Sequence, residues 1–179
     1  MTEKHQLRKA LLAARKAMPA DEKAWRDKAI GEHLLAWLAL NPAASIGVYW
    51  PTQGEPDLTG VYHTLAERGI LLALPVVIAR DAPLEFHVWR PGDALAADAH
   101  GVMAPAERGA VMTPELLVVP CVGFDARGYR LGYGGGYYDR TLAVERPPRT
   151  VGVAYAMCEA VFAVGEHDAR LGAVLTEYI

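Results

Sequence analysis

Short apolar runs of strand length alternate with segments of helical periodicity along most of this 179-residue chain. The predicted strands cover residues 46–50, 70–78, 84–89, 116–122, 150–155 and 173–178. The predicted helices cover residues 4–18, 21–40, 57–68 and 137–144. Such alternation is typical of a sheet of mostly parallel strands with helices on both faces. The sequence therefore predicts an α/β fold, a single-domain sandwich formed by residues 1–179.

Prolines and polar residues set the expected ends of these elements. Pro19 breaks the first helix, and the Asp21 side chain can cap the start of the second. Pro75 interrupts the apolar run 70–78, because proline has no N–H to donate to a neighbouring strand. Residues 91–114 contain several glycines and prolines, so we expect this segment to be mainly loop.

The composition narrows the class of protein. Hydrophobic residues make up 52% of the chain and charged residues 22%, which excludes an intrinsically disordered protein. The formal net charge of −3 argues against the strongly basic surface that nucleic-acid binding requires. Cys121 and Cys158 lie far apart inside apolar runs, so we expect buried reduced thiols, and neither a disulfide nor a zinc site.

No targeting or membrane-spanning segment is recognisable in the sequence. The first residues after Met1 are mostly polar, and no run approaches the roughly 18 apolar residues of a transmembrane helix. We therefore expect a cytoplasmic protein that binds neither membranes nor nucleic acid. We also expect a monomer that acts on a small molecule.

The glycine-rich segment 123–136 carries the clearest chemical signal. It follows a predicted buried strand and precedes a predicted helix, and ligands of open α/β sheets bind beyond the carboxyl ends of strands. Four of its glycines fall within residues 132–136, where bare backbone amides can approach an anion closely. Arg130 can neutralise a phosphate, and Asp139 can hold the magnesium ion that accompanies ATP.

Other interpretations of this segment were weighed against that one. Glycines alone would favour a surface hairpin, but Arg130, Tyr137, Tyr138 and Asp139 reverse this preference and favour a binding site. The segment is not a P-loop, since no Gly-Lys-Ser/Thr follows, and Tyr137 stands where a dinucleotide fingerprint needs its last glycine. Ser45 is the single serine of the chain, so a Gly-x-Ser-x-Gly hydrolase is excluded.

The run from Arg130 to Arg140, RLGYGGGYYDR, resembles the signature of 5-formyltetrahydrofolate cyclo-ligases position by position. The resemblance extends over nearly the whole chain. It includes a basic N-terminal helix with Lys4 and Arg8, and a loop with Glu55 that resembles the folate-side loop of the family. The resemblance implies an enzyme that consumes ATP and converts 5-formyltetrahydrofolate to 5,10-methenyltetrahydrofolate. In that reaction ATP phosphorylates the formyl oxygen, and nitrogen 10 of the folate then displaces phosphate.

The resemblance also implies which residues form the site. The residues expected to bind ATP are Lys4, Arg8, Arg130, Leu131, Gly132, Tyr133, Gly134, Gly135, Gly136, Tyr137 and Tyr138. The residues expected to bind the folate are Trp50, Glu55, Tyr133, Gly134, Gly135, Gly136 and Tyr137. The expected magnesium ligands are Asp139 and Asp168. Catalysis would rest on Arg130, Tyr137 and Asp139.

Each assignment has a plainer alternative. Asp139 could be a carboxylate that favours a helix start, Asp168 a turn residue, Glu55 a solvated loop residue and Trp50 a core aromatic. On the first helix, Lys4, Arg8 and Arg15 project within roughly 40° of one another, beside the apolar side. They could form a solvated basic stripe, although the resemblance favours contact between Lys4, Arg8 and phosphates.

The sequence departs from the family pattern at three positions. Ala104 replaces a common Glu or Gln, Gly135 stands where some members carry Lys, and Glu159 stands where Gln is common. Two rival functions therefore remain open. One is a relative that keeps the ATP site but acts on another small molecule. The other is a non-catalytic nucleotide-binding module, against which the intact Arg130, Asp139 and Glu55 argue.

Overall fold

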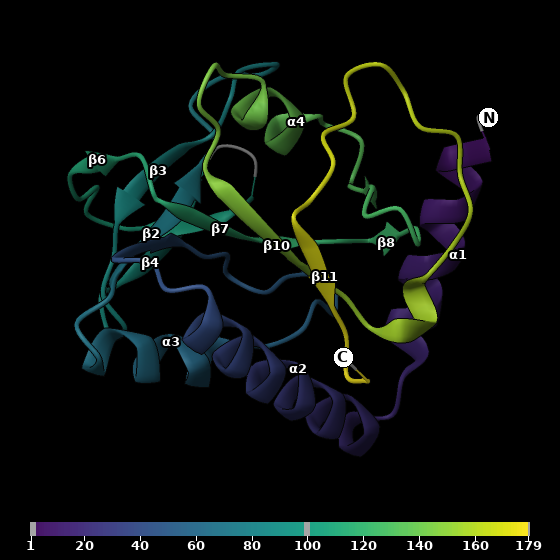
Figure 1. Cartoon of the computed structure of the whole chain (residues 1–179), viewed down its shortest axis with the longest axis horizontal. Coiled ribbons are helices and arrows are strands. Elements are labelled where there is room, and N and C mark those ends of the chain that lie inside the picture. Colours follow the sequence, from purple (N-terminus) through teal and green to yellow (C-terminus); the bar gives the residue numbers. More distant parts are fainter. Residues whose placement is uncertain (1–2, 99–100, 179) are drawn as a thin grey trace.

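The computed structural model describes residues 3–98 and 101–178 (Figure 1). Its helices are α1 (Glu3–Ala17), α2 (Ala20–Leu40), α3 (Thr59–Glu67), α4 (Tyr137–Leu142) and the 3-10 helix η1 (Ala156–Cys158). Its first strands are β1 (Ser45–Gly47), β2 (Leu71–Val76), β3 (Glu85–Val88), β4 (Leu95–Ala97), β5 (Met103–Pro105) and β6 (Val111–Met112). The remaining strands are β7 (Leu116–Pro120), β8 (Gly123–Phe124), β9 (Arg130–Leu131), β10 (Arg149–Val153) and β11 (Ala173–Leu175).

A seven-stranded sheet forms the centre of the molecule, in the order β11-β10-β7-β1-β2-β3-β6. The five strands from β11 to β2 run parallel, whereas β3 and β6 are antiparallel to their neighbours. Helices α2 and α3 lie along one face of this sheet and α4 lies on the other (Figure 1). The predicted α/β sandwich, with a mostly parallel sheet and helices on both faces, is therefore confirmed.

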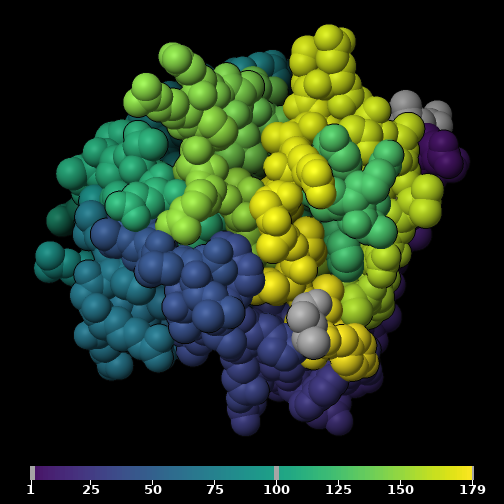
Figure 2. Space-filling model, in the orientation of Figure 1, coloured from purple at the N-terminus to yellow at the C-terminus, as the bar shows by residue number. Residues whose placement is uncertain are grey.

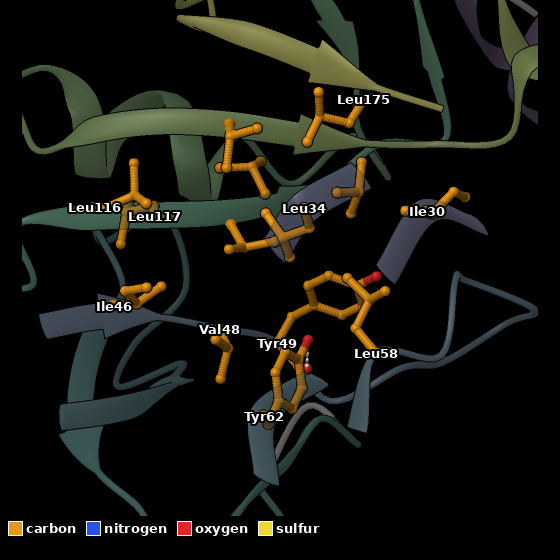
Figure 3. Close-up of a cluster of buried hydrophobic side chains, with 14 of the residues drawn as sticks. Ile30, Leu34, Ile46, Val48, Tyr49, Leu58, Tyr62, Leu116, Leu117 and Leu175 are labelled. Carbon is orange, nitrogen blue, oxygen red and sulfur yellow. Dashed lines mark hydrogen bonds between the residues drawn. The ribbon is translucent and has the colours of Figure 1, made fainter. Parts of the chain in front are cut away.

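The main core lies between α2 and the central strands. Ile30 and Leu34 of α2 are fully buried and belong to the same apolar cluster as Leu117 of β7 (Figure 3). Burial of a side chain of this size contributes about 1.5–3 kcal/mol. The same layer holds Tyr62 of α3, whose hydroxyl donates to the carbonyl of Tyr49 at 2.8 Å. This bond anchors the chain just beyond β1, where the loop with Glu55 begins.

Strand β2 runs through Pro75 without a break, so the predicted interruption at that residue is wrong. The sheet tolerates the proline because β1 pairs with β2 only as far as Ala73. Beyond that register, Pro75 has a strand on one side alone, where it lies opposite Phe86 of β3. A proline that has no second neighbour loses no hydrogen bond of the ladder.

Two other predicted boundaries differ from the structure. Helix α2 begins at Ala20, one residue before Asp21, and no side chain caps it. Asp21 is therefore a carboxylate of the first turn, where it favours the helix through the dipole. The segment 91–114 contains three short strands, of which β4 and β5 form a separate two-stranded sheet. Gly101 and Gly109 lie between these strands, Pro105 ends β5, and the other glycine and prolines flank the strands, so the short pairings are hidden from sequence analysis.

Helix α1 packs away from the main core, beside the β8–β9 hairpin (Figure 1). Leu11 of α1 joins Val122, Leu131 and Phe162 in a second, smaller apolar cluster. Leu131 immediately precedes residues 132–136, which we call the glycine-rich loop, so this packing holds α1 directly against that loop.

The C-terminal segment runs across the outside of the molecule to the first half of α2, as the yellow atoms of Figure 2 show. The buried carboxylate of Glu177 accepts hydrogen bonds from the Arg26 guanidinium and, at 2.8 Å, from the amide of Ala156. Tyr178 packs against Trp25 with ring centroids 6.1 Å apart. These contacts fasten the segment after β11 to α2.

Candidate active site

A cavity of about 430 Å³ opens at the carboxyl ends of the parallel strands. Its wall includes Trp50 after β1, Val77 after β2 and Pro120 at the end of β7. This is the edge at which open α/β sheets bind ligands. Every residue that the sequence assigns to the site lines this cavity: Lys4, Arg8, Trp50, Glu55, the run from Arg130 to Asp139, and Asp168.

The glycine-rich loop forms one wall of the cavity. Gly134 and Gly136 have φ angles of +101° and +66°, a region that side chains disfavour. At Gly135 an added Cβ atom would lie 2.7 Å from the Tyr137 ring, so a larger residue there would displace that ring. The helix behind the loop, α4, has only six residues, and its dipole contributes less than the predicted helix 137–144 would.

Arg130 and Asp139 form a partly buried ion pair at the base of this loop. Arg130 is 8% exposed, and its Nη2 atom donates to Oδ1 of Asp139 at 3.0 Å. It also lies 5.2 Å from the centre of the Tyr138 ring. Within residues 3–98 and 101–178, its Nε atom has no hydrogen-bond partner. The cation is thus held in place by Asp139 and the Tyr138 ring, with one buried donor that the described residues leave unpaired.

Asp168 lies beside this pair and bonds to Lys4 of α1. Nζ of Lys4 donates to Oδ2 of Asp168 at 2.8 Å, and the amide of Gly165 donates to the same oxygen at 2.8 Å. Partial burial raises the pKa of Asp168, but the bonds from Lys4 and Gly165 outweigh it and hold the pKa below its ordinary value. The amide of Ala169 reaches Oδ1 of Asp139 at 3.3 Å, so the two predicted metal ligands are neighbours. We call Lys4, Arg130, Asp139 and Asp168 the Asp168 group.

Arg8 bridges α1 and the glycine-rich loop. Its Nε atom donates to the carbonyl of Gly132 at 2.7 Å. A Cβ atom at Gly134 would lie 3.6 Å from Cζ of Arg8, so the guanidinium passes close to the bare backbone of the loop. Lys9 and Lys16 of the same helix are exposed. The basic residues of α1 therefore divide into a pocket side and a solvent side, and a uniform solvated stripe is wrong.

Glu55 is buried against Tyr133 of the glycine-rich loop, away from the Asp168 group. The residue is 2% exposed, and its carboxylate accepts two hydrogen bonds, from the Tyr133 hydroxyl at 2.7 Å and from the Thr52 amide at 2.8 Å. Burial raises the pKa of Glu55 above its ordinary value, although these two bonds and the charge of Arg15 lower it in part. The alternative of a solvated loop carboxylate is wrong. We call Trp50, Glu55 and Tyr133 the Glu55 group.

A tight turn points Glu55 inward. Gln53 and Gly54 both have positive φ angles, of 48° and 74°, and the Glu55 amide donates back to the Thr52 carbonyl at 2.9 Å. The Tyr49 hydroxyl donates to the carbonyl of Pro56 at 2.7 Å and fixes the far end of the loop. The carboxylate is thus held by a closed turn and not by a flexible loop.

Arg15 of α1 is a further residue of the site that the sequence analysis did not assign to it. Its guanidinium is buried behind the cavity wall and donates to the Tyr133 hydroxyl and to the Gln53 and Cys121 carbonyls. The sequence had placed it on the same side of α1 as Lys4 and Arg8. One feature of the sequence could have indicated its burial: Arg15 lies four residues after Leu11, on the same side of the predicted helix.

Comparison with known proteins gives this arrangement a family. The model of the 5-formyltetrahydrofolate cyclo-ligase family matches residues 1–177. The chain belongs to the 5-formyltetrahydrofolate cyclo-ligase family.

Proteins of this family resemble the chain along most of its length. A 5-formyltetrahydrofolate cyclo-ligase of Mycolicibacterium smegmatis is 34% identical over 150 residues, which cover 78% of this chain and 74% of the relative. The cyclo-ligase of Escherichia coli is 29% identical over 170 residues, which cover 90% of this chain and 93% of the relative. Among solved structures, the 5,10-methenyltetrahydrofolate synthetase of Aquifex aeolicus has a TM-score of 0.83 at 30% identity, covering 98% of this chain and 90% of that one. The synthetase of Mycoplasma pneumoniae has a TM-score of 0.80 at 27% identity, with 98% and 99% covered.

Two of the three departures from the cyclo-ligase pattern lie outside the cavity. Ala104 is buried in β5, and Glu159 is exposed after η1; neither lines the cavity wall. Gly135 does line it. The departures at residues 104 and 159 therefore give little support to a cyclo-ligase relative with a different substrate.

The carboxylates of this cyclo-ligase fold would need a ligand to complete a metal site. In the described part of the chain, no group of three or more His, Cys, Asp or Glu side chains could hold a metal ion alone. Asp139 and Asp168 offer two carboxylates, which suits magnesium, since this ion takes one or two carboxylates together with waters and substrate phosphates.

None of the described helices is long and apolar enough to cross a membrane.

Proposed function

We propose that this protein uses ATP to convert 5-formyltetrahydrofolate to 5,10-methenyltetrahydrofolate, with release of ADP and phosphate. Membership of the cyclo-ligase family supports the reaction. The observation that carries the proposal is a single cavity lined by both the buried acceptor Glu55 and the cations Lys4, Arg8 and Arg130. One set suits the hydrogen-bond donors of a pterin, and the other suits a triphosphate.

In the proposed reaction, the formyl oxygen attacks the γ-phosphorus of ATP and ADP leaves. Nitrogen 10 then attacks the formyl carbon and loses its proton, while the C–O bond breaks and phosphate departs. Such a transfer requires positioning and neutralisation of charge more than a covalent protein group. Lys4, Arg8 and Arg130 would neutralise the phosphates, and Tyr137 would contact both reactants.

The glycine-rich loop would place its backbone amides against the phosphates. Gly134 and Gly136 leave no side chain between the loop and a ligand, and their positive φ angles turn successive peptides in different directions. Magnesium would be held by Asp139 and Asp168, and would add positive charge at the transferred phosphoryl group. For these carboxylates to bind it, their hydrogen bonds with Arg130 and Lys4 would have to open.

At the other group, Glu55 would bind the folate. Each oxygen of its carboxylate accepts one bond from the protein, which leaves further lone pairs for the N–H donors of a pterin. Trp50 lines the cavity and packs edge-on against Trp89, with centroids 6.1 Å apart, so its indole is fixed as an apolar wall. A pterin ring would lie against this wall.

The decisive experiment is to incubate the purified protein with 5-formyltetrahydrofolate, ATP and magnesium. We expect the absorbance of the methenyl product to appear, with one ATP consumed for each product formed. Omission of ATP should abolish the signal. ATP binding without methenyl product from any of several folates would contradict the proposal and favour a relative that acts on another small molecule.

A further inference from the structure

Arg15 connects three segments of the cavity wall without lining the cavity itself. It is 2% exposed, and its Nη2 atom donates to the Gln53 carbonyl at 2.9 Å and to the Tyr133 hydroxyl at 2.8 Å. Its Nη1 atom donates to the Cys121 carbonyl at 3.2 Å. These partners belong to the Glu55 turn, the glycine-rich loop and the chain after β7, so one side chain ties all three together.

The bond to Tyr133 fixes the direction of the next hydrogen bond. A guanidinium has donors only, so the Tyr133 oxygen accepts from Arg15 and turns its own proton elsewhere. That proton is donated to Oε1 of Glu55, and the two oxygen atoms lie 2.7 Å apart. The result is a relay in one direction, from Arg15 through Tyr133 to Glu55.

The relay also connects the positive charge of Arg15 with the buried carboxylate of Glu55, which water hardly reaches. Glu55 is almost fully buried, and an ionised carboxylate at such a site needs hydrogen bonds or a nearby cation. Lys4 and Arg8 bond to other groups of the cavity, Asp168 and the carbonyl of Gly132. The charge that acts on Glu55 is that of Arg15, whose Cζ atom lies 6.0 Å from the centre of the Tyr133 ring.

We propose that Arg15 is a positioning residue for folate binding, which acts on Glu55 through the Tyr133 hydroxyl and does not touch the substrate. The relay holds the Glu55 carboxylate ionised and in one orientation, with its remaining lone pairs toward the cavity. Arg15 therefore sets affinity for the folate, whereas Lys4 and Arg8 on the same helix serve ATP. This inference rests on the proposed function, because Glu55 is taken to bind the folate.

The test measures the dissociation constant of 5-formyltetrahydrofolate by calorimetry without ATP, together with KM for folate and for ATP. Arg15→Met keeps the aliphatic stem and removes the charge and donors. We expect it to weaken folate binding roughly tenfold or more, the usual effect of losing a charge-assisted hydrogen bond, and to change the KM for ATP much less. Lys16→Met, the neighbouring exposed position of α1, is the matched control and should change neither.

A double-mutant cycle with Tyr133→Phe tests whether the effect passes through the hydroxyl. Tyr133→Phe alone keeps the ring and all other bonds of Arg15, and should weaken folate binding by itself. If the relay is correct, Arg15→Met then adds little in the Tyr133→Phe background. A full additional loss would overturn the inference, since Arg15 would then act through the Gln53 or Cys121 carbonyls.

Two further outcomes keep the inference separate from protein stability and from the proposed function. If Arg15→Met does not fold by circular dichroism, Tyr133→Phe decides: unchanged folate affinity in that variant would overturn the relay. If the wild-type protein makes no methenyl product, the proposed function fails. If the wild type is active and Arg15→Met matches it in both KM values, the inference alone fails.

Discussion

The Glu55 group and the Asp168 group hold their carboxylates with different partners and shift their pKa values in opposite directions. In the Glu55 group, a single buried carboxylate is held by a hydroxyl and an amide, and burial raises its pKa. In the Asp168 group, each carboxylate bonds directly to a cation, and the pKa of Asp168 is lowered. The first arrangement suits a ligand that offers neutral N–H donors. The second is a set of charges that can re-pair when phosphates and a metal ion arrive.

The largest effect is expected at the first group. Glu55→Gln retains the shape of the side chain but removes its charge, so folate binding should weaken roughly tenfold to a hundredfold. Affinity for ATP should change little. Calorimetric titration with each ligand measures both. The exposed Glu67→Gln is a suitable control, and equal losses for folate and ATP would remove the distinction between the groups.

A smaller loss is expected for the cations of α1. Arg8→Ala should raise the apparent KM for ATP by about tenfold, because a charge-assisted contact is lost. Lys4→Ala should raise it by about threefold, since Asp168 is then also released from its partner.

Lys9→Ala and Lys16→Ala are the controls for this pair, on the exposed side of the same helix. Steady-state kinetics at saturating folate should leave both unchanged. Four equal values would mean that α1 acts as a solvated basic face, and the assignment of Lys4 and Arg8 to phosphates would be wrong.

Asp139→Asn should act chiefly on the magnesium requirement. The variant keeps the size of the side chain and removes one charge, so the magnesium concentration at half-maximal rate should rise about fivefold, close to 1 kcal/mol. Turnover should fall while the circular dichroism spectrum stays the same. Glu145→Gln, just beyond α4, should leave the titration unchanged. An unaltered magnesium dependence of Asp139→Asn would reduce Asp139 to a partner of Arg130.

The smallest expected effect is a difference in pH dependence. Because the pKa of Glu55 is raised, folate affinity should begin to fall on acidification above the ordinary glutamate pKa of about 4.3, and Glu55→Gln should lack this change. The pKa of Asp168 is lowered in the folded protein, so the Lys4 pair stabilises the fold above the unfolded-state pKa. That contribution is lost only as the pH falls through the folded pKa. Folate titrations between about pH 4 and 7, and thermal unfolding between about pH 2 and 5, would separate the two.

Much of the cavity was predictable, because its ligands sit in a contiguous run. The residues from Arg130 to Asp139 follow one strand and line one wall, so local sequence is enough to group them. Lys4, Arg8 and Glu55 were added through the family resemblance, and they line the same cavity. Their roles in binding remain predictions.

The burial and partners of the distant residues could not be predicted. The charge of Glu55 suggests a solvated loop, and only the turn at Gln53 and Gly54 brings it under cover. Arg15 bonds to residues 38 to 118 positions away, and no periodicity within α1 contains that information. Strands β4 to β6 are two or three residues long, and pairing fixes them more than propensity does.

The attachment of α1 has a consequence for how the molecule is made. Lys4, Arg8 and Arg15 bond to residues 164, 124 and 106 positions further along the chain. Apart from the Gln53 carbonyl, which also accepts from Arg15, the partners of these three side chains lie between Cys121 and Asp168. Contacts of such sequence separation form late, because closing long loops costs entropy before it gains contacts. The cavity is thus completed only when α1 docks against this segment, and a chain that stops before Asp168 would lack a complete site.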